Sequence, residues 1–221
     1  MNRRTVGILA LAIITFFALC SGLRIERAGA VIEYVYIRAD GSIDPPMAPI
    51  TTTDNITYTF TNDLYSQIVV GKNSVLINGS GHMLARDGTG TGLNLTNRAN
   101  VTIQNLQITN FQSGIRLIQS NNVRIFNTEV SNNTFGVWVY GTNNTLAGNT
   151  IKNDANAGIV IDVYSFNNSI YGNNITDNSR GILTIMAYNN LIHHNNFVNN
   201  TVQAYAQVSG KQDCYNLLLP K

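Results

Sequence analysis

The chain of 221 residues is poor in cysteine and in charge. Its two cysteines are Cys20 and Cys214, and Cys20 lies in an N-terminal segment that we expect to be removed. Cys214 alone cannot form an internal disulfide, so the mature fold must depend on other interactions. Charged residues make up only 12% of the chain, with a formal net charge of +2. A basic surface is not predicted, and we expect no nucleic-acid partner.

The N-terminus has the pattern of a secretory signal peptide. Met1–Arg4 is basic, Val6–Cys20 is almost wholly apolar, and Ala28–Ala30 offers a small-x-small cleavage site. Cleavage after residue 30 changes the formal net charge to about −1, because four basic residues and one acidic residue leave. The alternative is an uncleaved anchor over Val6–Leu23, which would be the only membrane contact. Both alternatives predict a secreted, cell-surface or periplasm-like location.

Glycine recurs at a nearly constant spacing beyond this segment. Spacings of 22, 22, 22 and 23 residues separate Gly92, Gly114, Gly136, Gly158 and Gly181. Each glycine comes directly before an apolar residue, and in the first four repeats an apolar-x-apolar triplet follows, such as Ile115/Leu117. A fixed period with strand-like alternation inside it is typical of a solenoid whose unit is one β-circuit. The sequence therefore predicts an all-β parallel β-helix with about 22 residues per coil.

Asparagine forms a second periodic set at the expected corners. Its members stand five residues apart within each repeat: Asn100, Asn122, Asn144, Asn168 and Asn190; Asn105, Asn127, Asn149, Asn173 and Asn195; and Asn110, Asn132, Asp154, Asn178 and Asn200. Asparagine tolerates the left-handed conformation, and amides stacked about 4.8 Å apart can form ladders. The apolar positions slip by one residue against the asparagines after the second coil, which predicts a bulge there.

These repeats resemble a known family. The stretches from Asn143 to Ile159 and from Asn167 to Asn178 are similar to the repeat of NosD-type proteins, which belong to the pectin-lyase-like group. The resemblance covers roughly residues 67–203 and implies a right-handed, single-stranded parallel β-helix. The group contains lyases, hydrolases, epimerases, adhesins and binding modules, so the resemblance alone leaves the function open.

Three regions are predicted. Residues 1–30 form the signal peptide or anchor, residues 31–66 an N-terminal cap, and residues 67–221 a β-helix of about seven coils. The segment Tyr34–Pro46 resembles the leader that precedes the coils in archaeal surface members of the group. A solenoid needs an atypical cap where its first coil would expose strand edges. The chain ends soon after the last coil. We therefore expect the open end of the stack to be covered by the last segment, by a partner or, through end-to-end self-association, by a second copy of the chain.

One outward patch suits sugar rings. Strand alternation places Arg116, Trp138, Tyr140 and Asp162 on adjacent coils, with Tyr164 close by. Aromatic planes flanked by hydrogen-bonding groups accommodate the C–H faces of sugars. We therefore predict binding of polysaccharide or surface glycan; the alternative is that the aromatic residues only cover the sheet.

Catalysis has less support, and three other functions remain as alternatives. Asp162 has no acidic neighbour in its predicted column, whereas glycoside hydrolysis usually needs two carboxylates about 5–10 Å apart. A polysaccharide lyase, hydrolase or epimerase, a structural surface or adhesin module, and a NosD-type copper-related periplasmic protein are the alternatives.

No cofactor is expected, although two metal sites need consideration. Asp154 and Asp177 are predicted at equivalent corners of adjacent coils, where their carboxylates form a candidate Ca²⁺ site. The alternative is that aspartate simply replaces asparagine in the ladder. NosD-type relatives are linked to copper, which directs attention to His193 and His194. Because adjacent strand residues point to opposite faces, this pair is not expected to bind one ion, and copper is not expected.

Overall fold

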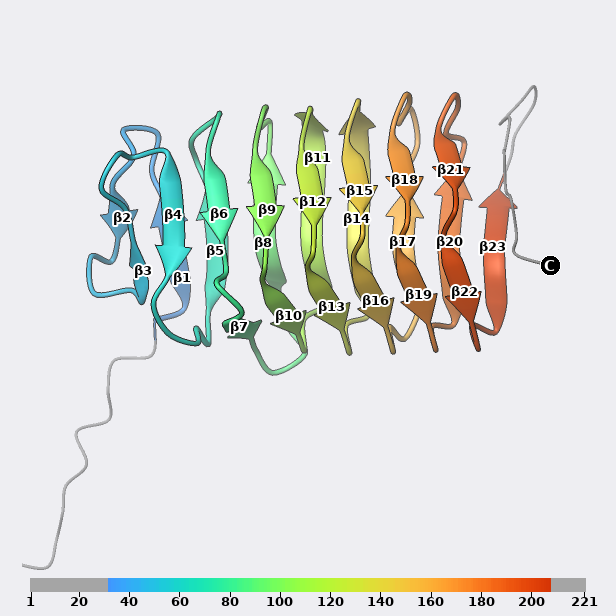
Figure 1. Ribbon diagram of the computed structural model, residues 1–221, viewed down its shortest axis with the longest axis horizontal. Coiled ribbons are helices and arrows are strands. Elements are labelled where there is room, and N and C mark those ends of the chain that lie inside the picture. The colour runs from blue at the N-terminus through green and yellow to red at the C-terminus, as the bar shows by residue number, and fades with distance from the viewer. Residues whose placement is uncertain (1–31, 208–221) are drawn as a thin grey trace, which may run out of the picture. The chain divides into compact units, whose positions relative to one another are not determined.

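The computed structural model describes residues 32–207, so the predicted signal peptide or anchor lies outside the described residues. Within that range every regular element is a β-strand, and the strands stack into a solenoid of about seven turns (Figure 1). No helix in this part of the chain is long and apolar enough to cross a membrane. The predicted parallel β-helix is confirmed.

Three sheets form the walls of the stack. Sheet A contains β1 (Tyr34–Ile37), β2 (Ile43–Asp44), β5 (Gln67–Val70), β8 (Thr91–Thr96), β11 (Ser113–Asn121), β14 (Phe135–Thr142), β17 (Ala157–Ile161), β20 (Arg180–Ile185) and β23 (Val202–Gln207). Sheet B contains β3 (Ile50–Thr51), β4 (Thr57–Phe60), β6 (Leu76–Asn78), β9 (Thr102–Gln104), β12 (Arg124–Phe126), β15 (Thr145–Ala147), β18 (Ser169–Tyr171) and β21 (Leu191–His193). Sheet C contains β7 (Met83–Ala85), β10 (Gln107–Thr109), β13 (Glu129–Ser131), β16 (Thr150–Lys152), β19 (Asn174–Thr176) and β22 (Asn196–Val198).

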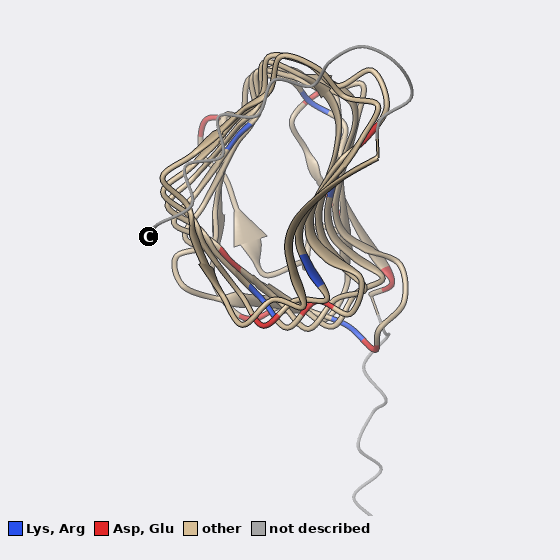
Figure 2. Ribbon diagram, turned by 90° about the vertical axis from the view of Figure 1, so that its right-hand side faces the viewer, with Lys and Arg blue, Asp and Glu red and all other residues tan. Residues whose placement is uncertain are grey.

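The core fills the inside of the coils with stacked aliphatic side chains. Ile115 and Leu117 of β11 are fully buried, while Arg116 between them is exposed. Equivalent residues of neighbouring coils pair in register, such as Ile115 with Val137. Viewed along the stack, successive coils superimpose, so equivalent side chains form columns along the axis (Figure 2).

Buried amides connect the coils at all three corners. Asn144 donates from Nδ2 to Oδ1 of Asn168 over 3.0 Å, and Asn168 donates to Asn190 over 2.9 Å. The same bond joins Asn149 to Asn173 and Asn173 to Asn195, each over 2.9 Å. These inner ladders confirm that asparagine stacks from coil to coil.

Each predicted asparagine set proves to combine two columns. In the first two repeats the members lie outside, in the left-handed conformation, with φ of +59° at Asn100 and +53° at Asn122. In the later repeats the members, such as Asn144, are buried, and the outer position belongs to the preceding residue, Asn143, with φ of +56°. The inner column therefore begins with Val101 and Val123 and continues with asparagine.

A single extra residue explains the change of column. Strand β11 pairs with β14 as Ile118 with Tyr140 and then Ser120 with Gly141, so Gln119 bulges out of the ladder. Its φ of +52° fits an inserted residue. The predicted bulge after the second coil is present, but it lies within the strand before the corner.

The glycine period results from close approach of adjacent coils. A Cβ atom on Gly136 would stand 2.4 Å from the carbonyl oxygen of Gly158, and one on Gly114 would stand 2.7 Å from that of Gly136. Real carbon atoms do not approach backbone oxygen so closely. At Gly114 and Gly136, only glycine therefore permits the coils to keep their spacing.

Residues 32–66 add strands to two of the sheets. Strand β1 pairs in parallel with β5, and β4 pairs in parallel with β6. The short strands β2 and β3 lie at the outer edges and run antiparallel to β1 and β4. The parallel stacking thus ends in two antiparallel pairs.

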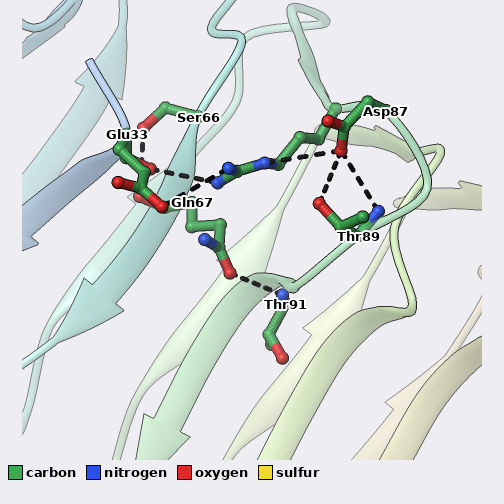
Figure 3. A network of polar contacts seen from close by, with 7 residues as sticks. Glu33, Ser66, Gln67, Asp87, Thr89 and Thr91 are labelled. Atoms are coloured by element: carbon green, nitrogen blue, oxygen red, sulfur yellow. Dashed lines mark hydrogen bonds and ion pairs between the residues drawn. The ribbon is translucent and has the colours of Figure 1, made fainter. Parts of the chain in front are cut away.

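A polar network joins this region to the first coils (Figure 3). The guanidinium of Arg86 lies between Glu33 and Asp87, with a nitrogen–oxygen distance of 3.6 Å to each carboxylate. Gln67, which is buried, accepts a hydrogen bond of 2.7 Å from the amide of Thr91 through Oε1. These contacts connect the start of β1, strand β5 and the loop that leads into β8.

We predict that Gly136→Ala lowers the free energy of unfolding by about 2–3 kcal/mol, because its methyl group would overlap a backbone oxygen that cannot move independently. Gly158→Ala is the matched control, since its Cβ would meet atoms only at 3.0 Å and beyond. Urea unfolding followed by circular dichroism checks the difference. Equal losses in the two variants would contradict the close-approach explanation.

Candidate functional site

The predicted sugar-binding residues lie on the outward face of sheet A. Arg116 of β11 pairs with Trp138 of β14, and Trp138 pairs with Val160 of β17. Tyr140 lies two residues beyond Trp138, and Asp162 directly follows β17. Because the strands are parallel and in register, side chains from three coils meet at one place. We call Arg116, Trp138, Tyr140 and Asp162 the sheet A patch.

Trp138 is the centre of this patch. Its indole Nε1 donates a hydrogen bond of 2.9 Å to Oδ2 of Asp162. The guanidinium carbon of Arg116 lies 5.5 Å from the centroid of the indole ring, a cation–π contact. Phe135 packs edge-on against the same ring at a centroid distance of 4.8 Å. Three neighbours therefore orient Trp138, which remains half-buried.

The two tyrosines of the prediction have different positions. Tyr140 is half-buried beside the Trp138 column and pairs with Ile118. Tyr164 lies in the turn after β17, with φ of +59° and 71% of its surface exposed. Direct contacts join Arg116, Trp138 and Asp162, whereas Tyr164 stands at the rim of the sheet.

The two aspartates of the candidate Ca²⁺ site do not occupy equivalent corners. Asp154 is 1% exposed and belongs to an inner ladder, where its amide donates to Oδ1 of Asn178 over 2.9 Å. Asp177 is exposed in the outer column, with φ of +58°. The prediction of equivalent positions is wrong by one residue, because β16 and β19 pair Lys152 with Thr176, which places Asp154 opposite Asn178 and not opposite Asp177. The two carboxylates therefore belong to different columns.

The two adjacent histidines converge. His193 ends strand β21, and His194 adopts the left-handed conformation with φ of +53°. Their Nδ1 atoms lie 2.7 Å apart, and the ring of His193 stacks on Tyr171 at 5.2 Å. The expectation that these side chains point to opposite faces is wrong, because alternation ends at the left-handed corner.

The sequence did not reveal two polar grooves along the corners of sheet B. The larger, of about 660 Å³, follows the corner between sheets B and C and includes Asn105, Asn127 and Gly148 in its lining. The smaller, of about 430 Å³, includes Asn100, Asn122 and Asn143. The detectable signal for the larger groove was the change from Asn105 and Asn127 to Gly148 and Gly172 in one column.

Comparison with protein families matches residues 31–216 to NosD, described as a periplasmic copper-binding protein. The chain belongs to the NosD family. A search of curated proteins gives no match.

Solved structures with a similar fold to this NosD-family chain include two proteins. The enzymatically active domain of tailspike protein 2 from bacteriophage CBA120 is 12% identical, with a TM-score of 0.48, over 68% of this chain and 34% of that domain. The alginate lyase from Paenibacillus sp. str. FPU-7 is also 12% identical, with a TM-score of 0.34, over 65% of this chain and 92% of the lyase. The NosD-family chain thus spans about a third of the tailspike domain. Neither likeness bears on its activity.

The family description raises the question of which residues fit copper. Two nitrogens bound to adjacent positions of one ion, each at about 2.0 Å, lie roughly 2.8 Å apart. The 2.7 Å separation in the His193–His194 pair fits this arrangement, and imidazole suits Cu(II). Among residues 32–207, no group of three or more His, Cys, Asp or Glu side chains is placed to hold a metal. The two Nδ1 atoms lie at hydrogen-bond distance from each other, and this pair offers a copper ion two nitrogen ligands without a third His, Cys, Asp or Glu among the described residues.

Asp154 introduces a titratable group into a ladder of amides. Asn178, on the next coil, donates from Nδ2 to Asn200 over 2.9 Å and to the carbonyl of Ile151 over 3.2 Å. Asp154 has an oxygen, Oδ2, in place of Nδ2, and this buried atom has no hydrogen-bond partner. Burial raises the pKa of Asp154 to about 8, so its carboxyl is largely protonated at neutral pH.

We predict that Asp154→Asn stabilises the fold increasingly as the pH rises from about 4 to about 8. The folded state keeps the Asp154 proton over this range while the unfolded chain, with a pKa of 3.8, loses it. The contribution of this carboxyl to stability is therefore full below pH 3.8 and lost as the pH approaches 8. The variant should gain about 1–3 kcal/mol at pH 8, because it restores the amide donor.

Urea unfolding at pH 4, 6 and 8 measures the difference between the variant and the parent protein. Asp177→Asn is the control, because the exposed Asp177 lies outside the inner ladder. A pH-independent difference for Asp154→Asn would contradict the raised pKa.

Proposed function

We propose that this NosD-family chain is an exported, non-catalytic module that binds polysaccharide or surface glycan through the sheet A patch. The observation that carries the proposal is the orientation of Trp138, which is held by Asp162 on one edge and by Arg116 against its ring. A side chain held in this way can receive a ligand with little further ordering. The family description as periplasmic supports the exported location.

The patch combines the groups that sugars require. An indole plane accommodates the apolar C–H face of a pyranose, while the charged groups beside it can bond to hydroxyl groups. Arg116 is exposed and its guanidinium can donate hydrogen bonds to a ligand, whereas the carboxylate of Asp162 can only accept them. The two charges are opposite, so the patch suits neutral sugars as well as uronic acids.

The non-catalytic part of the proposal is supported by the acidic residues. Asp162 already accepts from Trp138 through Oδ2 and from the amide of Val163 through Oδ1, over 2.8 Å. Its column on the neighbouring strands contains Tyr140 and Ile185 and no second carboxylate. The usual pair of hydrolytic carboxylates is therefore not assembled on this face.

Trp138→Ala is expected to weaken polysaccharide binding about tenfold, since it removes the stacking plane. Affinity electrophoresis in gels that contain soluble polysaccharide measures the retardation, and far-UV circular dichroism checks the fold. Tyr65→Ala is the control, because Tyr65 is 66% exposed and lies outside the patch. Trp138→Phe should retain part of the affinity. Unchanged retardation of Trp138→Ala would reject the sheet A patch as a glycan site.

Copper binding is the second candidate function, and the His193–His194 geometry favours it. Two imidazole nitrogens 2.7 Å apart can occupy adjacent positions on Cu(II), with water in the others. A ring nitrogen must be free of its proton to bind the metal, since only then does it have a lone pair to donate.

We expect His193→Ala and His194→Ala each to weaken Cu(II) binding more than tenfold. Electron paramagnetic resonance of the full chain titrated with Cu(II) reports the nitrogen ligands directly. His82→Ala serves as the control, because His82 lies near Asp63 and away from the pair, with a nitrogen–oxygen distance of 3.5 Å. Equal binding by all three variants would reject the pair as a copper site.

A further inference from the structure

The groove at the corner between sheets B and C has an orderly polar floor. An outer amide ladder runs along it: Asn105 donates from Nδ2 to Oδ1 of Asn78 over 3.1 Å, and Asn127 donates to Oδ1 of Asn105 over 2.5 Å. These three asparagines line the groove of about 660 Å³. They differ from the inner ladders because they face solvent.

The outer ladder stops at two glycines. Gly148 and Gly172 follow Asn127 in the same column, with φ of +64° and +63°. A Cβ on Gly148 would meet nothing within 4 Å, and one on Gly172 would meet only the Gly148 amide at 3.8 Å. The corner is therefore open over two coils, a length of about 10 Å along the axis.

Two exposed aromatic residues of sheet B precede residues of this corner column in the sequence, and a hydroxyl group lies across the corner. Tyr171, directly before Gly172, is 40% exposed and stacks on His193 at 5.2 Å. Phe126, directly before Asn127, is 37% exposed. On the other side of the corner, Thr150 lines the groove at the start of β16. The groove lining thus offers hydrogen-bonding groups on its floor and on one side, while the two exposed rings lie on strands of sheet B next to the corner.

The groove carries almost no net charge. Its lining contains one ionisable side chain, Glu129, and this carboxylate lies 3.0 Å from the ammonium group of Lys152. The other lining side chains are amides, hydroxyls, glycines and one leucine. Such a surface can exchange many neutral hydrogen bonds but gives no preference to phosphate or carboxylate groups.

We propose that this groove binds a neutral polysaccharide chain that lies parallel to the solenoid axis. A polymer in that direction passes one corner per coil, every 4.8 Å or so, and meets an equivalent amide or opening at each step. A ligand with a regular repeat matches such a site better than a single small molecule does. The inference rests on the proposed function, since it assigns glycan chemistry to a second location.

A second glycan site gives one molecule two places to bind polysaccharide. The sheet A patch lies on the outward side of β11, β14 and β17, whereas the groove lies at the corner between sheets B and C. Two separate sites allow one molecule to hold two chains, or one long chain twice, with a corresponding gain in avidity.

Asparagine-to-glycine changes at matched corners test the groove. Asn105→Gly/Asn127→Gly removes two groove amides, and Asn110→Gly/Asn132→Gly removes two asparagines of the same coils at another corner. All four residues have positive φ, between +47° and +60°, so glycine fits each position without strain. Circular dichroism and the unfolding midpoint verify that the variants fold.

The probes are hydroxyethyl cellulose as a neutral polymer and alginate as a uronic polymer, used in affinity electrophoresis of the full chain. The groove variant should bind hydroxyethyl cellulose about tenfold more weakly, while the control variant should change less than twofold. Adding Trp138→Ala to the groove variant should abolish the remaining retardation.

Each outcome separates the two sites. A groove variant that equals the parent protein while Trp138→Ala is weakened would overturn the groove and leave the sheet A patch in place. Equal weakening of the groove and control variants would also overturn it, since the effect would then be structural. Loss confined to the groove variant supports the inference even if Trp138→Ala binds normally. No retardation of the parent protein by either polymer overturns both proposals.

Discussion

The amide hydrogen bond between stacked asparagines is the interaction on which the other features depend. It joins one coil to the next at each corner, for example over 2.9 Å from Asn173 to Asn195. Buried amides that are fully hydrogen-bonded favour a single register, because any slip would leave them without partners. This role matters more in a fold that the sequence predicts to have no internal disulfide. Glycines such as Gly136 allow the coils to approach closely enough for these bonds.

A fixed register also explains how a repetitive chain can build specific sites. Outward residues carry few constraints, yet each lies in a column at a known distance from its equivalents. Trp138 can therefore meet Arg116 from the previous coil and Asp162 from the next, although 46 residues separate the two charges. The same rule places Asn127 against Asn105 in the outer ladder. Inward positions supply stability, and outward positions remain available for recognition.

The sequence predicted the coil length, the parallel sheets, the inward aliphatic residues and the placement of Arg116, Trp138 and Asp162 on adjacent coils, because strand period and repeat period are both local signals. The sequence-based assignment of asparagines to columns was wrong where one inserted residue shifted the alignment of the coils. Gln119 lengthens a strand by one residue, so Asn122 lies in the outer column and Asn144 in the inner one. Backbone conformation caused the second failure: the left-handed φ of His194 turns its ring toward His193. Simple alternation cannot foresee either effect.

Glycan binding by a non-catalytic β-helix is tested most directly by size-exclusion chromatography of the full chain incubated with neutral and uronic polysaccharides, with and without Ca²⁺. Intact polymer should co-elute with the protein and keep its original length after prolonged incubation. Shortened polymer would contradict the non-catalytic role and direct attention to Asp162. Separate elution of protein and every polymer would contradict glycan binding itself.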